Sequence, residues 1–358
     1  MYSFGPNINI SQRLDSLAAD PSSDNLVLLA QEYIKALSYV SLPQNFSIDV
    51  FSDLLSCIDT LNYHTTSSDL SILVAVERVL WKQRPNLHSD FLDLLFETIV
   101  PLIPMDNKLY RPRLFQAFHF YCGTWSSYLD FCDWYGFDNF QDRDYIPLGR
   151  NSLAESAFIA YSRKLLSLSV TRIYIPFYID FIAEAQSHSF TVYSLYHIAS
   201  FLVAMGFNSQ LILRVIRPYI KLKFTKPWSW ILVANVFPDS DIRKKACIYF
   251  AVSCCGVNKP AVDNSVFSVV VDFFKRVGDF DSAHYFVDLS INSGNPIDSA
   301  LSDCVSQKWY VNSHPSFSLD DLDYKSICHN IFADITDVDS NLWNYLCNDL
   351  LRLYNVLA

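Results

Sequence analysis

Five basic side chains lie close together in a stretch of the chain that has no acidic residue. Between Ala185 and Pro238 there is no Asp or Glu, and the cations are Arg214, Arg217, Lys221, Lys223 and Lys226. Cations of this kind bind nucleic-acid phosphates, and aromatic rings beside them stack on bases. Arg214, Arg217 and Lys221 follow at i, i+3 and i+7, so on a helix they share one face. We expect an RNA-contacting surface here, with these rings nearby: Tyr219, Phe224, Trp228 and Trp230.

The charge of the rest of the chain leaves two other interpretations of this segment open. The 358 residues carry a formal net charge of −10, and residues 279–358 hold twelve aspartates against three basic residues. An acidic total favours a simply solvated helix face, or a face that docks an acidic protein segment. The molecule is therefore expected to be electrically polar, with a basic middle and an acidic end.

No residue pattern predicts catalysis. The chain has eight glycines and none of the glycine-rich phosphate loops, dinucleotide fingerprints or G-x-S-x-G elbows. Cys122 and Cys132 stand ten residues apart, and Cys328 with His329 has only the distant Cys347 as a further ligand, so metal-ligand spacing is missing. We expect a protein that is not an enzyme and has no metal, cofactor or small-molecule substrate. An unrecognised helical enzyme remains a third hypothesis.

Aromatic residues and cysteines favour a packed core in a reducing compartment. The run from Phe115 to Phe140 is rich in rings but has no Lys or Arg among them, so a core between helices is favoured over a base-stacking platform. The nine cysteines are scattered, and the adjacent Cys254 and Cys255 are expected to be core thiols rather than a redox pair. We expect an intracellular location, in the cytoplasm or the mitochondrion, with no membrane span and no visible targeting peptide.

The pattern of apolar residues predicts an all-α protein. Apolar positions recur at i, i+3, i+4 and i+7, as at Phe267, Val270, Val271 and Phe274, and glycine-based hairpin turns are scarce. Besides that stripe, helices are expected near residues 24–40, 47–61, 68–83, 89–103, 112–131, 151–168, 171–185, 190–205, 208–223, 239–254, 280–292, 320–333 and 338–355. Short polar links between them favour antiparallel helical pairs, which cover their apolar faces by stacking into a right-handed, solenoid-like array.

The segment "KRVGDFDSAHYF" predicts one such pair in detail. Gly278 ends a helix in the left-handed conformation, Asp279 or Asp281 caps the next helix, and Ala283 lets the two helices approach closely. The surrounding segment, residues 264–298, resembles a pentatricopeptide repeat, and its "GDFDSA" core is similar to the tetratricopeptide repeat. The resemblance implies base-reading positions at Ser268 and Asp298.

A second, weaker pattern involves three prolines. "LLFETIVPLI" aligns with "LILRVIRPYI", and "RIYIPFYI" has a similar ending, which places Pro101, Pro176 and Pro218 at a loose period of about 37 to 42 residues. With the "MGF" link at residues 205–207, these segments resemble the helical pairs of octotricopeptide and heptatricopeptide proteins. That resemblance implies work on RNA in organelles.

These patterns predict a helical-repeat binding protein. We expect an N-terminal helical array at 1–142, a central array with the basic face at 143–298 and an acidic C-terminal cap at 299–358. The favoured function is that of an RNA-associated or ribonucleoprotein subunit with protein partners. The alternative is a protein-binding scaffold subunit that contacts no nucleic acid.

Overall fold

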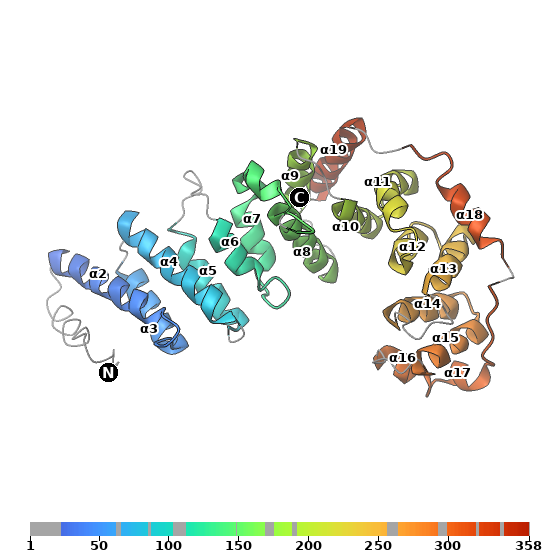
Figure 1. The fold of residues 1–358 in the computed structure, drawn as a ribbon, viewed down its shortest axis with the longest axis horizontal. Coiled ribbons are helices and arrows are strands. Elements are labelled where there is room, and N and C mark those ends of the chain that lie inside the picture. The colour runs from blue at the N-terminus through green and yellow to red at the C-terminus, as the bar shows by residue number, and fades with distance from the viewer. Residues whose placement is uncertain are drawn as a thin grey trace. The chain divides into compact units, whose positions relative to one another are not determined.

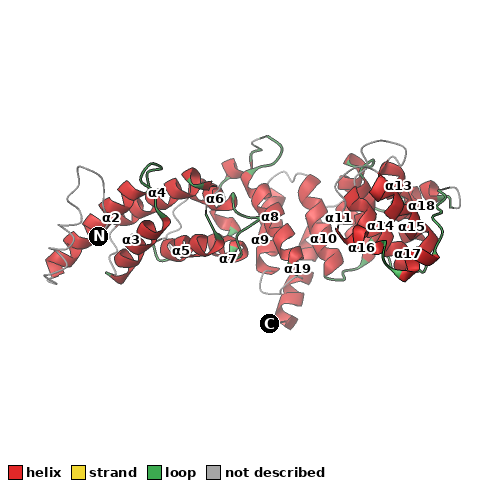
Figure 2. Cartoon of the chain, turned by 90° about the horizontal axis from the view of Figure 1, so that it is seen from below, coloured by secondary structure: helices red, strands yellow, loops and turns green. Residues whose placement is uncertain are grey.

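The computed structural model describes residues 23–61, 66–84, 87–102, 112–147, 149–168, 175–187, 192–255, 264–292, 299–319, 322–336 and 340–357. Helices and turns, and no strand, occur among them, which confirms the all-α class (Figure 2). None of the helices in these ranges is both long and apolar enough to cross a membrane.

The chain folds as two compact units. The first comprises residues 1–165 and 173–184, and the second comprises residues 166–172 and 185–358. The predicted boundaries at 142/143 and 298/299 fall inside these units, and the division into three functional parts stays a prediction.

The first unit is built from short helices that pack on sequence neighbours and on the next helix but one. Helix α2 packs on α3 and α4, α3 on α5, and α4 on α6. The helices are α2 (Ser23–Val40), α3 (Ile48–Thr60), α4 (Thr66–Lys82), α5 (Ser89–Ile99), α6 (Pro112–His119), α7 (Tyr128–Tyr135), α8 (Leu153–Ser167) and α9 (Ile175–Ser187), with 3-10 turns η3 (Phe137–Asn139) and η4 (Asp142–Tyr145) between α7 and α8.

The aromatic run of this unit forms its core, as the sequence predicted. Trp125 and Phe131 are fully buried, and their ring centroids lie 5.4 Å apart. The indole N–H of Trp125 donates to Asp93 at 2.6 Å, so the largest ring is buried with its polar atom satisfied. The predicted single helix at 112–131 is wrong, because turns around Gly123 separate α6 from α7.

The second unit contains three consecutive helical pairs (Figure 1). They are α10 (Val192–Ala204) with α11 (Ser209–Leu222), α12 (Pro227–Ala234) with α13 (Ile242–Cys255), and α14 (Asn264–Arg276) with α15 (Phe280–Asn292). The first helices begin at Val192, Pro227 and Asn264, and α12 contacts both α10 and α14. Three hairpins with regular spacing are therefore present, while a right-handed solenoid remains a prediction.

Two of the three links are built in the same way. Gly206 and Gly278 have φ values of 71° and 79°, which side chains rarely adopt. The next residue donates its N–H back across the last turn, from Phe207 to the Leu202 carbonyl at 3.0 Å and from Asp279 to the Phe274 carbonyl at 2.9 Å. The predicted left-handed Gly278 is thus confirmed.

The link at Gly278 also confirms the predicted cap and close contact. The Asp279 carboxylate accepts the N–H of Ser282 at 3.1 Å, so Asp279, rather than Asp281, caps α15. Ala283 is 0% exposed, and α14 packs on α15. The hairpin within residues 264–298 is present, whereas the family resemblance stays an expectation.

The predicted proline period has no structural counterpart. Pro101 follows the end of α5, Pro176 lies in the first turn of α9, and Pro218 lies inside α11. These are three different positions relative to a helix, so the prolines do not mark equivalent points of a repeat.

The remaining helices of the second unit are α16 (Ser299–Cys304), α17 (Lys308–Asn312), α18 (Tyr324–Ile331) and α19 (Ser340–Leu357). Helices α16 and α17 pack on α15, and α18 packs on α13. The buried Sγ atoms of Cys247 on α13 and Cys328 on α18 lie 4.0 Å apart. Residues far apart in sequence therefore form one core in this unit.

Candidate nucleic-acid interface

Helix α11 positions the first three predicted cations. Asn208 caps it by accepting the N–H of Gln210 at 2.8 Å. One stripe of α11 is buried and contains Leu211, Ile212, Val215 and Ile216 among others. Because that stripe faces the core, the cations lie at its edge and beyond: Arg214 and Arg217 are half-buried, and Lys221 is exposed.

Lys223 and Lys226 lie in the turn between α11 and α12, which is held rigidly. The Ser229 hydroxyl donates to the Lys223 carbonyl at 3.0 Å, and the Trp230 indole N–H donates to the Phe224 carbonyl at 2.7 Å. Trp230 itself is fully buried, whereas Phe224 is 44% exposed. Of the predicted aromatic companions, Trp230 therefore belongs to the core and cannot stack on a ligand.

Two tyrosines of α10, which the sequence did not predict, join the predicted Tyr219 of α11 beside the lysines. The Lys223 ammonium lies 5.0 Å from the Tyr193 ring centroid, a cation–π distance. The Tyr219 ring lies 6.3 Å from Tyr193 and 5.1 Å from Tyr196, and all three tyrosines are half-buried. We call these tyrosines, together with Lys221, Lys223 and Lys226, the basic patch.

The α10 tyrosines were missed for a definable reason. Tyr193 and Tyr196 are 23 or more residues from Tyr219 in the sequence, and the hairpin link at Gly206 brings them together. Their i, i+3 spacing on a strongly apolar helix is typical of core residues. The contact between Tyr193 and Lys223 forms only when α10 packs on α11, so the sequence pattern alone does not indicate it.

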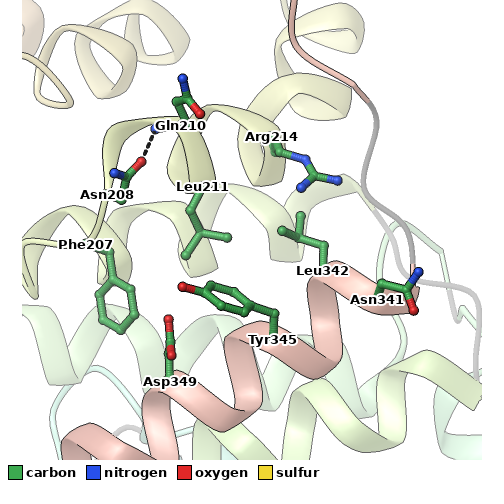
Figure 3. A pocket seen from close by; sticks show the side chains of 9 residues that line it. All are labelled: Phe207, Asn208, Gln210, Leu211, Arg214, Asn341, Leu342, Tyr345 and Asp349. Atoms are coloured by element: carbon green, nitrogen blue, oxygen red, sulfur yellow. Dashed lines mark hydrogen bonds between the residues drawn. The ribbon is translucent and has the colours of Figure 1, made fainter.

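Arg214 lies in a different setting from the lysines. A cavity of about 520 Å³ is lined by α11, the residues before it and α19. Figure 3 shows Arg214 reaching from α11 toward Asn341 and Leu342 of α19. The lining residues are Phe207, Asn208, Gln210, Leu211, Arg214, Asn341, Leu342, Tyr345 and Asp349. The predicted basic face is therefore divided, with Arg214 next to a helix of the acidic C-terminal region.

The acidic end of this cavity lies on α19. Asp349 forms an ion pair with Arg352 at 3.5 Å, and its hydrogen bond with the Tyr345 hydroxyl raises the pKa of that phenol. Tyr345 is 55% exposed. The cavity thus combines an apolar floor with one arginine and one aspartate, a composition suited to a protein segment rather than to a strongly anionic chain.

The two positions implied by the repeat resemblance are not brought to the basic patch. Ser268 is half-buried on α14, between the buried Phe267 and Val270. Asp298 lies outside the described residues. Their base-reading role stays an expectation.

One cluster has the residue types of a hydrolase. His284 Nδ1 lies 2.9 Å from the Ser313 hydroxyl, and its Nε2 lies 3.5 Å from an Asp288 carboxylate oxygen. The same Nδ1 is also 3.1 Å from the Ser313 carbonyl, and a nitrogen facing a carbonyl carries the proton. That nitrogen cannot also accept the serine proton. The cluster therefore holds neighbouring segments together, and we call it the clasp.

The clasp joins α15 to the residues that follow α17. The Ser313 hydroxyl donates to the Tyr310 carbonyl at 3.1 Å, the Tyr310 hydroxyl donates to Asp288, and the Tyr310 ring lies 3.8 Å from the His284 ring. Ser313 is separated from His284 by 29 residues, and no sequence signal linked them. Each member is occupied by packing or hydrogen bonding inside the network.

Among the residues that the structure describes, no group of three His, Cys, Asp or Glu side chains is placed to hold a metal. None of the nine cysteines, all of which lie within the described residues, is in a disulfide, including the adjacent Cys254 and Cys255. Burial raises the pKa of the Cys254 thiol to about 11, so this thiol is protonated and weakly nucleophilic at neutral pH.

Comparison with known proteins gives one match. Residues 192–327 match the model of a domain of unknown function, DUF7017. The matched span begins at the first residue of α10 and ends within α18, so it contains the three hairpins and the basic patch and excludes α19. No curated protein and no solved structure matches the chain.

Proposed function

We propose that the protein is a non-catalytic helical binding protein that contacts RNA through the basic patch. The proposal rests on the contact between the Lys223 ammonium and the Tyr193 ring. Both residues belong to a segment of the sequence that has no acidic residue. Lysines neutralise phosphates, and tyrosine rings offer faces for unpaired bases. Single-stranded RNA has both groups accessible, so it is the expected form of the ligand.

Local charge supports this proposal despite the acidic total. Phosphates interact with cations mainly within about 10 Å at ordinary salt, so distant aspartates are largely screened. No carboxylate occurs between Ala185 and Pro238, and Lys221 and Lys226 are exposed at the end of α11 and in the following turn. An RNA backbone would therefore be attracted to the patch more strongly than the net charge of −10 suggests.

The test is a binding titration with a fluorescent single-stranded RNA. The double variant Lys223→Gln/Lys226→Gln should weaken binding about tenfold or more at low salt, across unrelated RNA sequences. The matched control is Lys308→Gln/Lys325→Gln, which removes the same charge from two exposed lysines of the acidic region. Equal binding by the two variants would remove the patch from the proposal.

The cavity beside Arg214 favours a second candidate, a protein-binding scaffold. Helix α19 of this chain lies beside Arg214 in the wall of this cavity, so the region already accommodates a helical segment. A partner that binds through this region should remain with the protein after ribonuclease treatment and be lost from Arg214→Gln. Loss of every partner on ribonuclease treatment would instead favour the RNA-contacting function.

A further inference from the structure

The first unit contains a cavity unrelated to the basic patch. It has a volume of about 530 Å³ and lies along α4, with one residue from α6. Its lining residues are Val74, Glu77, Arg78, Trp81, Lys82 and Arg113. Three cations against one carboxylate make the lining positive in an acidic protein. The volume lies within the usual range of about 300 to 1,000 Å³ for small-molecule sites.

Both guanidinium groups of this cavity are held in place by the protein. Arg78 Nη1 donates to the Ser38 carbonyl at 3.1 Å and to the Ser41 hydroxyl at 2.7 Å. Arg113 Nε pairs with Glu77 at 3.1 Å. A guanidinium fixed by some of its donors keeps the others in a set direction, which lowers the entropy lost when it binds an anion.

Trp81 forms part of the cavity wall with its ring. Its indole N–H is buried, and no protein group accepts it among the described residues. The Arg84 guanidinium lies 3.8 Å from the Trp81 ring centroid and 4.3 Å from that of Phe120, so the indole has a fixed support.

We propose that this cavity binds a small phosphate-bearing molecule. A phosphate monoester group has three terminal acceptor oxygens and close to two negative charges at neutral pH, which suits two fixed guanidinium groups and a lysine. Arg113 is 78% exposed at its side chain, so the cationic wall is accessible from solvent. The Glu77 carboxylate is paired with Arg113, and this pairing offsets its repulsion of a bound anion.

Calorimetric titration of the full chain tests the proposal with inorganic phosphate, adenosine monophosphate and adenosine as separate probes. Saturable binding of phosphate and of the nucleotide, without binding of adenosine, is the expected result. Nucleotide binding tighter than phosphate binding would assign the site to a nucleotide, and equal binding would assign it to phosphate itself. Binding of adenosine as tight as that of the nucleotide would overturn the proposal, as would the absence of saturable binding by both anions.

Variants locate the binding. Lys82→Gln/Arg113→Gln should weaken phosphate binding at least tenfold, whereas Lys35→Gln/Arg150→Gln removes equal charge outside the cavity and should leave it unchanged. Lys82→Gln alone keeps the Arg113–Glu77 pair and serves if the double variant is unstable, with a loss of about threefold. Equal weakening by the cavity variants and the control would overturn the site.

Discussion

Gly278 tests the hairpin link at the scale of a single residue. Its φ of 79° is unfavourable for a side chain, although a Cβ there would meet no atom within 4 Å. Gly278→Ala should therefore lower the free energy of unfolding by about 1 to 2 kcal/mol through backbone strain alone. Gly123→Ala is the control, since its φ is not left-handed and its Cβ would also meet nothing. Urea unfolding that gives equal losses for both variants would contradict the link.

Ala283 tests the packing on the other side of the same link. It is fully buried on α15, so Ala283→Leu should overpack the core at a cost of about 1 to 3 kcal/mol. Ala333 is exposed after α18, and Ala333→Leu should have little effect. An unchanged thermal midpoint for Ala283→Leu would show that α15 does not make this contact.

His119 links the aromatic core of the first unit to pH. Burial lowers the pKa of His119 to about 4, and its Nδ1 lies 2.7 Å from the Tyr128 hydroxyl. In the unfolded chain the group takes up a proton near pH 6.5, so stability falls as pH drops from about 6.5 toward 4. Between pH 7 and pH 5 this group should contribute a loss of about 2 kcal/mol.

The variant His119→Gln isolates that contribution, because glutamine can bond to Tyr128 and does not titrate. Chemical unfolding at pH 7 and pH 5 should show a smaller loss of stability for the variant than for the unchanged chain. The same loss in both proteins would show that folding does not lower the pKa of His119.

At the scale of elements, α18 shows how distant segments complete the core. Tyr324 of α18 is 9% exposed, and its ring lies 6.0 Å from Phe250 and 6.4 Å from Tyr249 on α13. Tyr324→Ala should cost about 3 to 5 kcal/mol by analogy with other buried rings, whereas Tyr345→Ala, at a ring 55% exposed, should cost far less. Similar unfolding midpoints for the two variants would contradict the docking of α18 on α13.

Sequence periodicity predicted most helices and missed those without a period. Helix α12 was not predicted because residues 229–234 are all buried, so no polar face alternates with an apolar one. Helices α6 and α7 were merged because apolar residues continue through the turn that separates them. The Gly278 link was predictable in detail, since glycine, a cap and a small residue each have a local cause.

The candidate site was only partly predictable for a similar reason. Its lysines are visible as a charge pattern, but the partners of those lysines depend on tertiary contacts. Tyr193 contacts Lys223 because α10 packs on α11. Arg214 lies beside α19, which is more than 120 residues away in the sequence. Helix periodicity placed Arg214, Arg217 and Lys221 on one face without showing what covers each of them.

At the scale of the whole molecule, charge is distributed so that net and local values differ. The chain is acidic overall, yet residues 185–238 lack acidic side chains and residues 279–358 hold twelve aspartates. A binding function based on the basic patch therefore has to be sensitive to salt, because its contacts are with ions at the surface. A scaffold function based on apolar contacts would be much less sensitive.

The salt dependence of RNA binding is the most direct test of the basic patch. The affinity for a single-stranded RNA should be measured between 50 and 300 mM salt, roughly the range in which such binding is informative, for the unchanged chain and for Lys223→Gln/Lys226→Gln. If both lysines contact phosphates, the logarithmic slope should be shallower in the variant by about 1.4, while Lys308→Gln/Lys325→Gln keeps the original slope. Identical slopes for the unchanged chain and the patch variant would contradict RNA binding through this surface.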